Sequence, residues 1–596
     1  MSFLPSLSPG NVVDRYLPSD AEFDSNYKWT RPTEWLDLNV PDGVPEKIIG
    51  LIAVFPNDKG GGARNYVTFN LDTDDSSSYT VDWGDGNVET VGSNVTVTHI
   101  YDYDNITSDT STMKSTTFRG YRQAKFEVTL QGSARFGGTQ GQINFDIDGP
   151  YVTIAGFPYR NGPNILDLFV SSSLATNPTI NNLRPMKMLE QLEFRNTSSN
   201  RTTQPELIYR GCMSLQSIPF VPYVRNAGSE GYGQAFAYCV SLQYLPDGFA
   251  DNDKYWFKNP SSLSQTFEYC YRLRYLPEGL FGDPDSVLSS CSSFYLTFRD
   301  NRNLKYIPYI GMRTSGGEVR VDYMFSNCLD LKAIPKGVHL SNISSAGIGR
   351  MFYSCRECYD FSVLDLSTLN RSNIDMTQTF VNLDSLIEFP YIGNFTAANN
   401  VEDLLNGSTQ LQRFNSQHTH LDFTNARDMR QTFMSCENLK ELPPIHVTAL
   451  SNGTSLYQTF YGCWSLQSVI FVGMTTGPSD GEYYRCFFNC FSLQYISGID
   501  FSYADDAGDY SQTFEVCRNL ARIDFPGAED GSDERGFSQT VSLRYCPLNR
   551  DAMVNIFNHL VTTSGKTITL TNNSYTSDLS AADIQIATDK GWTVVT

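Results

Sequence analysis

One short motif recurs along the C-terminal two-thirds of this chain. Each copy has an aromatic residue, a Cys three positions later, a Leu three positions after that, and an Ile or Leu three further on, often followed by Pro. Phe236-Cys239-Leu242-Leu245-Pro246 is a clear example. Thirteen copies, most of them 27 residues apart, predict a solenoid, because a unit of this length cannot bury its own apolar face and must stack on its neighbours.

The copies differ in how closely they follow the pattern. The clear copies begin at Phe236, Phe267, Phe325, Phe433, Phe460, Phe488 (one residue short of the usual spacing) and Phe514. The weaker copies begin at Tyr209, Phe298, Phe352, Phe380, Leu405 and Phe537. Together they predict about 13 coils within residues 181–546.

Most of the 13 cysteines occupy one position of the repeat. They are Cys212, Cys239, Cys270, Cys328, Cys355, Cys436, Cys463, Cys490 and Cys517. A small apolar thiol that fills a tight inward position once per coil explains them. Leu383 and Ser408 replace Cys in two copies, which a disulfide framework would not tolerate. The pairs Cys355/Cys358 and Cys486/Cys490 favour core packing in the same way, over metal or redox chemistry.

The spacing within a unit also predicts local structure. The aromatic residue and the Cys, three apart, fit one helical turn, and Leu-x-x-Ile fits a short strand. A Gln precedes many of the motifs and predicts a hydrogen-bonded ladder from coil to coil. These residues are Gln234, Gln265, Gln378, Gln431, Gln458 and Gln512. We therefore expect a mainly β protein, with short strands and short helical turns in the solenoid.

Composition narrows the function classes. The net charge of −21 argues against nucleic acid, which requires a basic footprint, and against anionic membrane. With 596 residues, 38 Phe and 34 Tyr, the chain should fold into several modules. No apolar run is long enough to span a bilayer, and the first 20 residues lack the features of a signal peptide, so we expect the chain to fold in the cytoplasm.

Three other regions flank the repeat. Residues 1–44 read as a Pro-rich extended arm whose apolar anchors are Trp29 and Trp35. The arm could dock on another protein or pack on its own second module. Residues 45–180 read as all-β, and residues 547–596 as a cap on the last coil. In the cap we expect helices over 553–561 and 579–590, the second with Ser580 as N-cap and Asp583 three residues later, and strands over 567–570 and 592–595.

Tyr, Lys and Arg gather between the Leu and the Ile of successive strands, on one ribbon of an acidic chain. The ribbon residues are Tyr244, Arg274, Tyr275, Lys305, Tyr306, Lys332, Arg413, Lys440, Tyr495, Arg522, Arg544 and Tyr545. Exposed Tyr beside cations suits a sugar or a protein partner. The alternative is a structural ladder in which Tyr rings stack and Lys and Arg stems cover them.

Catalytic and metal-binding patterns are weak. Six His occur, and His418-x-His420 has no third ligand nearby, so we expect a solvated loop there. The sequence has no nucleophile elbow, P-loop or zinc-protease motif. Acidic clusters at 72–75, 505–509 and 530–534 lack the spacing of an EF-hand. We expect neither an enzyme nor a cofactor. Weak Ca²⁺ binding and a glycosidase-like carboxylate pair stay open as alternatives.

Two resemblances follow from these motifs. The Phe-x-x-Cys-x-x-Leu-x-x-Ile-Pro repeat, over about 205–546, resembles the leucine-rich repeats of bacterial surface antigens of the BspA-like class. The segment from Tyr79 to Gly86, with Asp-Trp-Gly-Asp-Gly at its end, and the later His99-Ile100-Tyr101 resemble β-sandwich domains of the polycystic-kidney-disease (PKD) type. That resemblance implies structural roles: Trp83 in the sandwich core, and Asp85 and Gly86 in a turn.

An arm, a PKD-like module and this repeat in one chain resemble structural proteins of tailed bacteriophages. The resemblance implies a virion component in tail, baseplate, fibre or head decoration, present in several copies and anchored to other virion proteins through residues 1–44. The solenoid would then contact a neighbouring protein or a glycan or protein of the host surface. A bacterial cell-surface adhesin is the alternative, and a polysaccharide-acting enzyme is a third.

Overall fold

The structure is a computed structural model. It describes residues 29–41, 46–56, 65–115, 117, 119–136, 142–144, 151–154, 157–160, 164–172, 179–181, 186, 188–196, 209–216, 218, 232–245, 260–277, 279–282, 284, 287–313, 316–369, 371–448, 450, 456–475, 483–504, 510, 512–527 and 532–596. The chain forms two compact units, residues 1–261 with 265–280, and residues 262–264 with 281–596. The fold is mainly β, and no described helix has the length and apolar content needed to cross a membrane.

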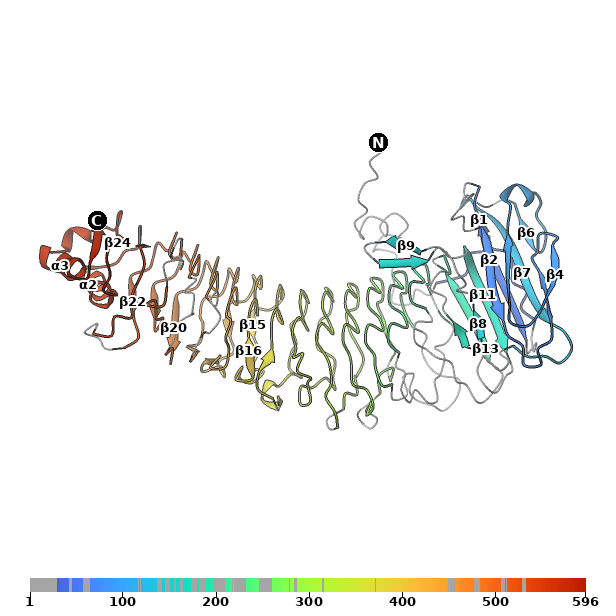
Figure 1. The fold of residues 1–596 in the computed structure, drawn as a ribbon, viewed down its shortest axis with the longest axis horizontal. Coiled ribbons are helices and arrows are strands. Elements are labelled where there is room, and N and C mark those ends of the chain that lie inside the picture. Colours follow the sequence, from blue (N-terminus) through green and yellow to red (C-terminus); the bar gives the residue numbers. More distant parts are fainter. Residues whose placement is uncertain are drawn as a thin grey trace. The chain divides into compact units, whose positions relative to one another are not determined.

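The first unit contains a sandwich of two sheets (Figure 1). The larger sheet has the strand order β13 (Gln191–Asn196), β11 (Ile165–Ser172), β1 (Lys47–Val54), β7 (Arg122–Leu130), β3 (Tyr79–Asp82) and β4 (Val88–Val91), with β6 (Met113–Lys114) also on β7. The smaller sheet has the order β12 (Thr179–Asn181), β8 (Gln142–Asn144), β2 (Tyr66–Leu71) and β5 (Val95–Ile100). Strands β9 (Tyr151–Ile154) and β10 (Phe157–Arg160) form a separate hairpin.

Aromatic side chains from both sheets form the sandwich core. Phe69 of β2 lies 5.7 Å from Trp83 and 6.3 Å from Phe126 of β7, measured between ring centroids. Trp83 is buried at the end of β3, and its indole N–H donates to Glu89 Oε1 at 2.6 Å. Asp85 accepts from the backbone N–H of Asn87 within the turn to β4. Trp83, Asp85 and Gly86 thus lie where the sequence motif predicted, in the core and in the turn.

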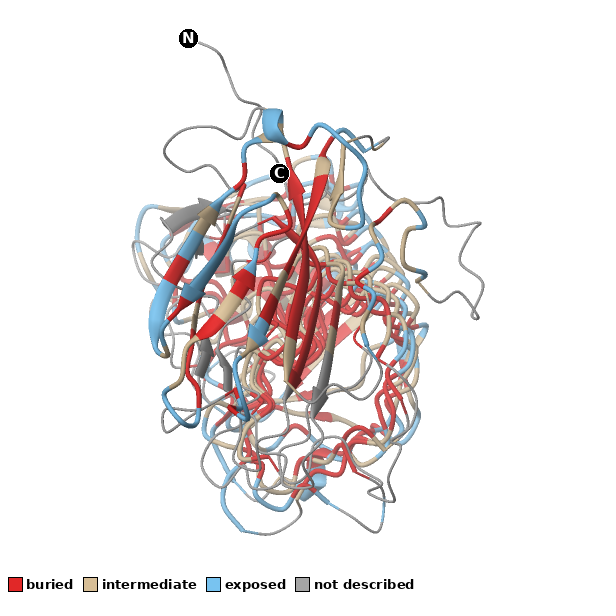
Figure 2. Cartoon of the chain, turned by 90° about the vertical axis from the view of Figure 1, so that its right-hand side faces the viewer, coloured by how far each residue is buried: buried red, intermediate tan, exposed pale blue. Residues whose placement is uncertain are grey.

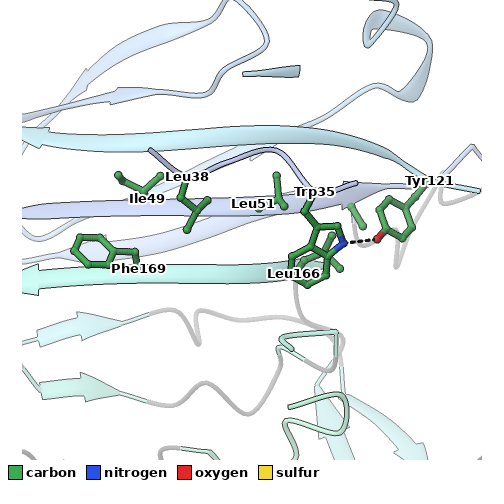
Figure 3. Packing of buried hydrophobic residues seen from close by; sticks show 8 residues of the cluster. Trp35, Leu38, Ile49, Leu51, Tyr121, Leu166 and Phe169 are labelled. Carbon is green, nitrogen blue, oxygen red and sulfur yellow. Dashed lines mark hydrogen bonds between the residues drawn. The ribbon is translucent and has the colours of Figure 1, made fainter. Parts of the chain in front are cut away.

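The outer face of the larger sheet is covered by the end of the arm, residues 29–41. Strand β1 is buried on both faces: Gly50 faces the sandwich core, where an added Cβ would clash with Phe126, while Ile49 and Leu51 face the arm. Trp35, with only 4% of its surface exposed, lies beside Leu51 and Leu166, and Leu38 lies beside Ile49 (Figure 3). This double covering explains why the sequence of β1 is almost entirely apolar. Figure 2 shows the buried strands of the chain in red.

Polar contacts hold the arm in place. The Trp35 indole N–H donates to the Tyr121 hydroxyl at 3.0 Å (Figure 3), and Arg31 Nε donates to Asp167 Oδ2 at 2.7 Å. Burial raises the pKa of Asp167 even though Arg31 opposes the rise. Trp29 packs on Trp35 at 6.2 Å. Trp35 is therefore buried against the chain's own second module, as the alternative reading predicted, and half-buried Trp29 packs beside it. Residues 1–28 lie outside the described residues.

The repeat begins on the sandwich sheet itself. Strand β13 pairs in parallel with β11, and the next coil follows it, because the backbone N–H of Gln216 donates to the carbonyl of Glu190. The same bond recurs between later coils, such as Arg274 N–H to Gln243 O. The strand-rich module therefore continues past the boundary expected at residue 180, and β13 serves both structures.

Each coil contains a run of turns followed by a short parallel strand. In the coil of Phe236, hydrogen bonds of the turn type join Ala235 N–H to Tyr232 O and Cys239 N–H to Phe236 O. Gln234 and Tyr238, each the third residue of its turn, have φ of 62° and 65°. Positive φ at this position is typical of type II turns, so the described segments that join Phe to Cys are successive turns. A regular helix would keep φ negative.

The described strands of the second unit pair only in parallel, and one end of the unit carries helices (Figure 1). The strands of the coils are β14 (Ile374–Asp375), β15 (Glu388–Phe389), β16 (Ala398–Asn400), β17 (Arg413–Phe414), β18 (Leu421–Asp422), β19 (Ile445–His446), β20 (Ser468–Val472), β21 (Tyr495–Ser497) and β22 (Arg522–Asp524). The end region holds β23 (Val541–Ser542), α2 (Arg550–His559), β24 (Lys566–Thr569), α3 (Ala581–Asp589) and β25 (Trp592–Val595).

The end region closes the array largely as predicted. Ser580 and Asp583 form a reciprocal capping box at the start of α3, and Gly591 follows its end with φ of 85°. Arg550 of α2 donates twice to the Asp583 carboxylate, at 2.9 and 2.7 Å. Strands β23, β24 and β25 continue the parallel pairing of the coils.

Two predicted copies of the motif need correction. Phe487, not Phe488, stacks between Phe460 (5.3 Å) and Phe514 (5.9 Å), which restores a spacing of 27 residues on both sides. Phe537 meets Phe514 edge-on at 79°, so it is not the next stacking residue. Cys546 N–H donates instead to Leu543 O, and Tyr545 has the positive φ of the repeat, which makes Leu543 and Cys546 the last copy.

Candidate interaction surface

Four side-chain ladders make each coil rigid, and they determine what remains exposed. The aromatic residues stack face to face, for example Phe433 on Phe460 at 5.5 Å and 6°. Gln431 donates to Gln458 at 2.8 Å, as the ladder prediction required, and Gln234 donates to Gln265 at 2.6 Å. These contacts repeat at the same positions in successive coils, so a residue's place in the motif predicts its neighbours in the adjacent coils.

The cysteine ladder has a function that the sequence did not indicate. The Cys463 thiol donates to the carbonyl of Phe433 in the preceding coil at 3.0 Å. Equivalent bonds start from Cys239, Cys270, Cys328, Cys355, Cys436, Cys490 and Cys517. Ser408 donates in the same way to Phe380 O at 3.1 Å, which explains how Ser can replace Cys. The thiol is therefore a buried donor as well as a small apolar group.

Threonine forms a fourth ladder, which sequence reasoning missed. Thr459 Oγ1 donates to the carbonyl of Met429 in the preceding coil at 3.0 Å. Thr266, Thr297, Thr379, Thr432 and Thr513 make the equivalent bond. The recurring Gln-Thr-Phe string could have indicated this ladder. In it, Gln donates to a Gln of the following coil, Thr donates to a carbonyl of the preceding coil, and Phe stacks on the Phe of each neighbouring coil.

The predicted ribbon lies at the strand positions that these ladders leave outside the core. In the first unit, Tyr244 and Tyr275 occupy one parallel bridge, beside Arg274. In the second unit, Lys305, Tyr306, Arg413, Lys440, Arg522, Arg544 and Tyr545 are exposed, while Lys332 and Tyr495 are half-buried. The structure therefore brings most ribbon residues to the two strand positions after the motif's Leu, within each unit. The prediction is wrong for Arg544 and Tyr545, which lie in the turn between Leu543 and Cys546.

Two further residues belong to the ribbon. Tyr359 and Ile387 occupy the position of Lys332 in the next two coils and are 59% and 55% exposed, against 65% for Tyr306. The motif's Leu is Cys358 in the coil of Tyr359, which hid that residue from the pattern. Tyr359 and Ile387 are therefore exposed apolar side chains on adjacent coils, and Lys332 lies in the coil between those of Tyr306 and Tyr359.

Part of the ribbon's charge is neutralised within the chain. Lys332 pairs with Glu357 of the next coil at 2.8 Å, and this lysine lowers the pKa of Glu357. Arg413 pairs with Glu388 at 2.7 Å. Arg522 pairs with Asp524 at 2.8 Å and lies 5.9 Å from the Tyr495 ring. This part of the ribbon matches the structural-ladder alternative. Among the described residues, Lys305 and Lys440 form no ion pair, and Tyr306 interacts electrostatically with Lys332.

The predicted histidine pair is divided. His418 is buried among Phe389, Phe395 and Phe414, so the expected solvated loop is wrong for this residue. Its Nε2–H donates to Pro390 O at 3.0 Å, and burial lowers its pKa. His420 instead stacks on His446 at 4.2 Å. In the described part of the chain, no three His, Cys, Asp or Glu side chains gather as metal ligands would.

All thirteen cysteines are free and buried. Burial raises their pKa values, to about 12 for Cys436, so at neutral pH these thiols carry no thiolate for nucleophilic or metal chemistry. Among the acidic clusters, Asp74 and Asp75 accept hydrogen bonds from Arg135 N–H and Ser77 N–H in the turns around them. The cluster at 505–509 and residues 530–531 of the cluster at 530–534 lie outside the described residues, and Glu534 of the second cluster accepts hydrogen bonds from Thr562.

Comparisons with known proteins add little beyond the architecture. No family model matches the sequence, and no curated protein matches it. A leucine-rich cell surface protein of Faecalibacterium prausnitzii is 14% identical, with a TM-score of 0.29, over 67% of this chain and 94% of that one. A mouse RP105/MD-1 complex is 13% identical, with a TM-score of 0.17, over 69% and 71%. At such scores we draw no function from either protein, and the solenoid rests on the parallel pairing and ladders described above.

Proposed function

We propose that this chain is a non-enzymatic structural and adhesion protein whose solenoid presents the strand ribbon to a partner. The observation that carries the proposal is the exposure of Tyr359 and Ile387, each more than half exposed on adjacent coils, with Tyr306 65% exposed two coils before Tyr359. Large apolar side chains rarely stay exposed in a row on a monomer surface without a binding role. Free Lys305 beside Tyr306 adds a cation for an acidic or hydroxyl-rich partner.

Site-specific cross-linking tests this use of the ribbon. A photo-reactive amino acid replaces Tyr306 or Tyr359 in the full chain, and Tyr575, which is 43% exposed in the end region, is the control site. The native particles or cells that carry the protein are irradiated, and cross-linked species are identified by mass spectrometry. Adducts at 306 and 359 but not at 575 support the proposal. Equal labelling at the three sites, or none at the ribbon, contradicts it.

We further propose that the chain is a component of a tailed-phage virion. Support comes from its combined resemblances: a PKD-like segment around Trp83, and a leucine-rich repeat with an N-terminal arm. Since Trp35 is occupied within the chain, attachment to other virion proteins would fall to residues 1–28. Mass spectrometry of purified particles tests this. We expect the full chain to be present in the particles at a fixed copy number, and a chain of residues 29–596 to be absent from them. Detection on the bacterial surface and absence from particles would favour the adhesin instead.

A further inference from the structure

A second exposed surface lies on the turns of two coils, away from the strand ribbon in the repeat. It is formed by the six aromatic side chains that occupy three equivalent positions of the coils of Phe460 and Phe487. We call it the turn strip: Tyr457, Tyr461, Trp464, Tyr484, Phe488 and Phe491. Trp464 and Phe491 are 45% and 41% exposed, and the other four are half-buried.

The rings pair across the two coils. Tyr461 and Phe488 stack at 5.2 Å and 5°, and Tyr457 and Tyr484 stack at 5.6 Å and 22°. Trp464 and Phe491 differ, because their planes cross at 68° with centroids 6.5 Å apart. Rings at that angle do not cover each other, which leaves both open to a ligand. The Trp464 indole lies over Gly462, where an added Cβ would be 3.8 Å from Nε1, so it adjoins Tyr461 in one surface.

Polar groups within the strip are available to a ligand. The Arg485 guanidinium lies 4.8 Å from the Tyr484 ring centre and 5.3 Å from that of Phe488, and its Nε donates to Gln512 Oε1. Its two terminal nitrogens have no acidic partner among the described residues. The indole N–H of Trp464 likewise has no acceptor in the described part of the chain. Arginine and indole N–H groups are strong donors for hydroxyl oxygens.

The charges around the strip balance. In the adjoining coils, Glu437 and Arg518 take the position of Trp464, and Glu515 takes the position of Phe488. Together with Arg485 they make two cations and two anions, and none of them forms an ion pair in the described structure. A balanced rim supplies donors and acceptors without selecting a charged ligand. It therefore favours a neutral, hydroxyl-rich molecule over an acidic or basic one.

Size argues against a protein partner here. Two coils at a strand spacing of ~4.8 Å cover roughly 10 Å along the solenoid. A stable protein interface buries about 800 Å² on each side, which needs a far wider patch. A narrow row of rings with hydroxyl-binding groups fits a chain of sugar units, because each sugar presents an apolar C–H face to a ring and hydroxyls at its edge.

We infer that the turn strip is a binding site for a neutral polysaccharide, with Trp464 and Phe491 as the stacking platform and Arg485 as a hydroxyl ligand. The site is separate from the strand ribbon and does not depend on the proposed function of that ribbon.

Affinity electrophoresis of the full chain tests the inference. Native gels contain a soluble neutral β-glucan, a neutral galactomannan or, as a charged comparator, alginate. We expect at least one neutral polymer to retard the protein, equally in low and high salt. The double variant W464A/F491A should bind about tenfold more weakly, as loss of a central aromatic contact does. The control Y575S changes an exposed aromatic residue of the end region and should bind like the wild type. A third variant, Y306S/Y359S, tests separately whether the ribbon binds the sugar.

Each contrary result is distinguishable. Lack of retardation by both neutral polymers overturns the inference, as does retardation that W464A/F491A leaves unchanged. Binding only to alginate, lost in high salt, would mean an electrostatic surface. Thermal denaturation of each variant verifies folding, since substitutions of exposed side chains should leave the melting temperature nearly unchanged. Loss of polysaccharide binding in Y306S/Y359S alone would assign the sugar to the ribbon instead.

Discussion

The sandwich and the repeat are stabilised over different distances along the chain. In the sandwich, Arg31 pairs with Asp167 across 136 positions, and Trp35 bonds Tyr121 across 86. In the repeat, the Cys463 bond to Phe433 spans 30 positions and the Gln431 bond to Gln458 spans 27. A lesion in the sandwich therefore disturbs contacts from the whole module, whereas a lesion in a coil disturbs two neighbours.

Removing the arm should have the largest effect. A chain that begins at residue 45 exposes Ile49, Leu51 and Phe169 and leaves buried Asp167 without Arg31. Even the single change Trp35→Ala should cost about 3–5 kcal/mol in the sandwich, because it empties a closed site. Denaturation followed by limited proteolysis should show early loss of the sandwich and later loss of the repeat. Trp464→Ala, at an exposed position, is the matched control and should cost under about 0.5 kcal/mol.

The aromatic stack should show a smaller and more local effect. Phe460→Ala removes a ring from between Phe433 and Phe487 and should cost about 3 kcal/mol. Phe460→Leu should cost only about 1 kcal/mol, because Leu405 already occupies this position in another coil. Hydrogen exchange should become faster for the amides of the adjoining coils and stay unchanged for those of the sandwich. Equal loss of protection in both regions would contradict the nearest-neighbour picture.

Substitutions of Cys463 can distinguish the contribution of apolar packing to stability from that of the thiol hydrogen bond. Cys463→Ser should stay within about 1 kcal/mol of the wild type, since Ser408 shows that a hydroxyl can donate to the preceding coil. Cys463→Val keeps the site apolar, with a slightly larger side chain, but loses the donor, so it should cost about 1–2 kcal/mol. Chemical denaturation measures both. If Val proved the better replacement, the thiol would act as an apolar group only. A thiol reagent should modify all thirteen cysteines only after unfolding.

The smallest expected effect is a pH dependence from His418. Burial lowers the pKa of this imidazole below its ordinary value of 6.5, so the folded chain binds fewer protons than the unfolded chain. The free energy of unfolding should therefore fall as the pH drops below about 6.5, and level off below the folded pKa. His418→Phe should remove this part of the slope when unfolding is followed between pH 8 and 5. His420→Gln, at the half-exposed histidine that stacks on His446, is the control. It should leave the contribution of His418 to the pH dependence of the free energy of unfolding unchanged.

Periodic features of the fold were predictable from the sequence because they repeat. The phase of Cys239, the Gln234 ladder and the Ser580 capping box each depend on neighbours at fixed spacing. Trp83 and its turn were predictable because a hairpin is local. The prediction failed where two aromatic residues adjoin, as at Phe487 and Phe488, since both could fill the motif and only stacking on Phe460 decides between them.

Other features depend on contacts that no local pattern carries. The docking of Trp35 requires knowing which face of β1 lacks a second sheet. The exposure of Tyr359 was hidden because Cys358 replaces Leu beside it. His418 was read as a solvated residue because its aromatic neighbours come from three different segments of the chain. The turn strip combines positions that the motif treats as variable, and only the pairing of adjacent coils brings its rings together.

The thiol ladder also has a direction. Each cysteine of the ladder donates to a carbonyl in the coil that precedes it, so the acceptor for Cys463 is already synthesised when Cys463 leaves the ribosome. Translation runs from the N-terminus, and domains commonly fold in that order. The sandwich, with β13 paired to β11, supplies the first template, and every later coil can lock onto a completed one. The array can therefore grow during synthesis one coil at a time, without waiting for its C-terminal cap.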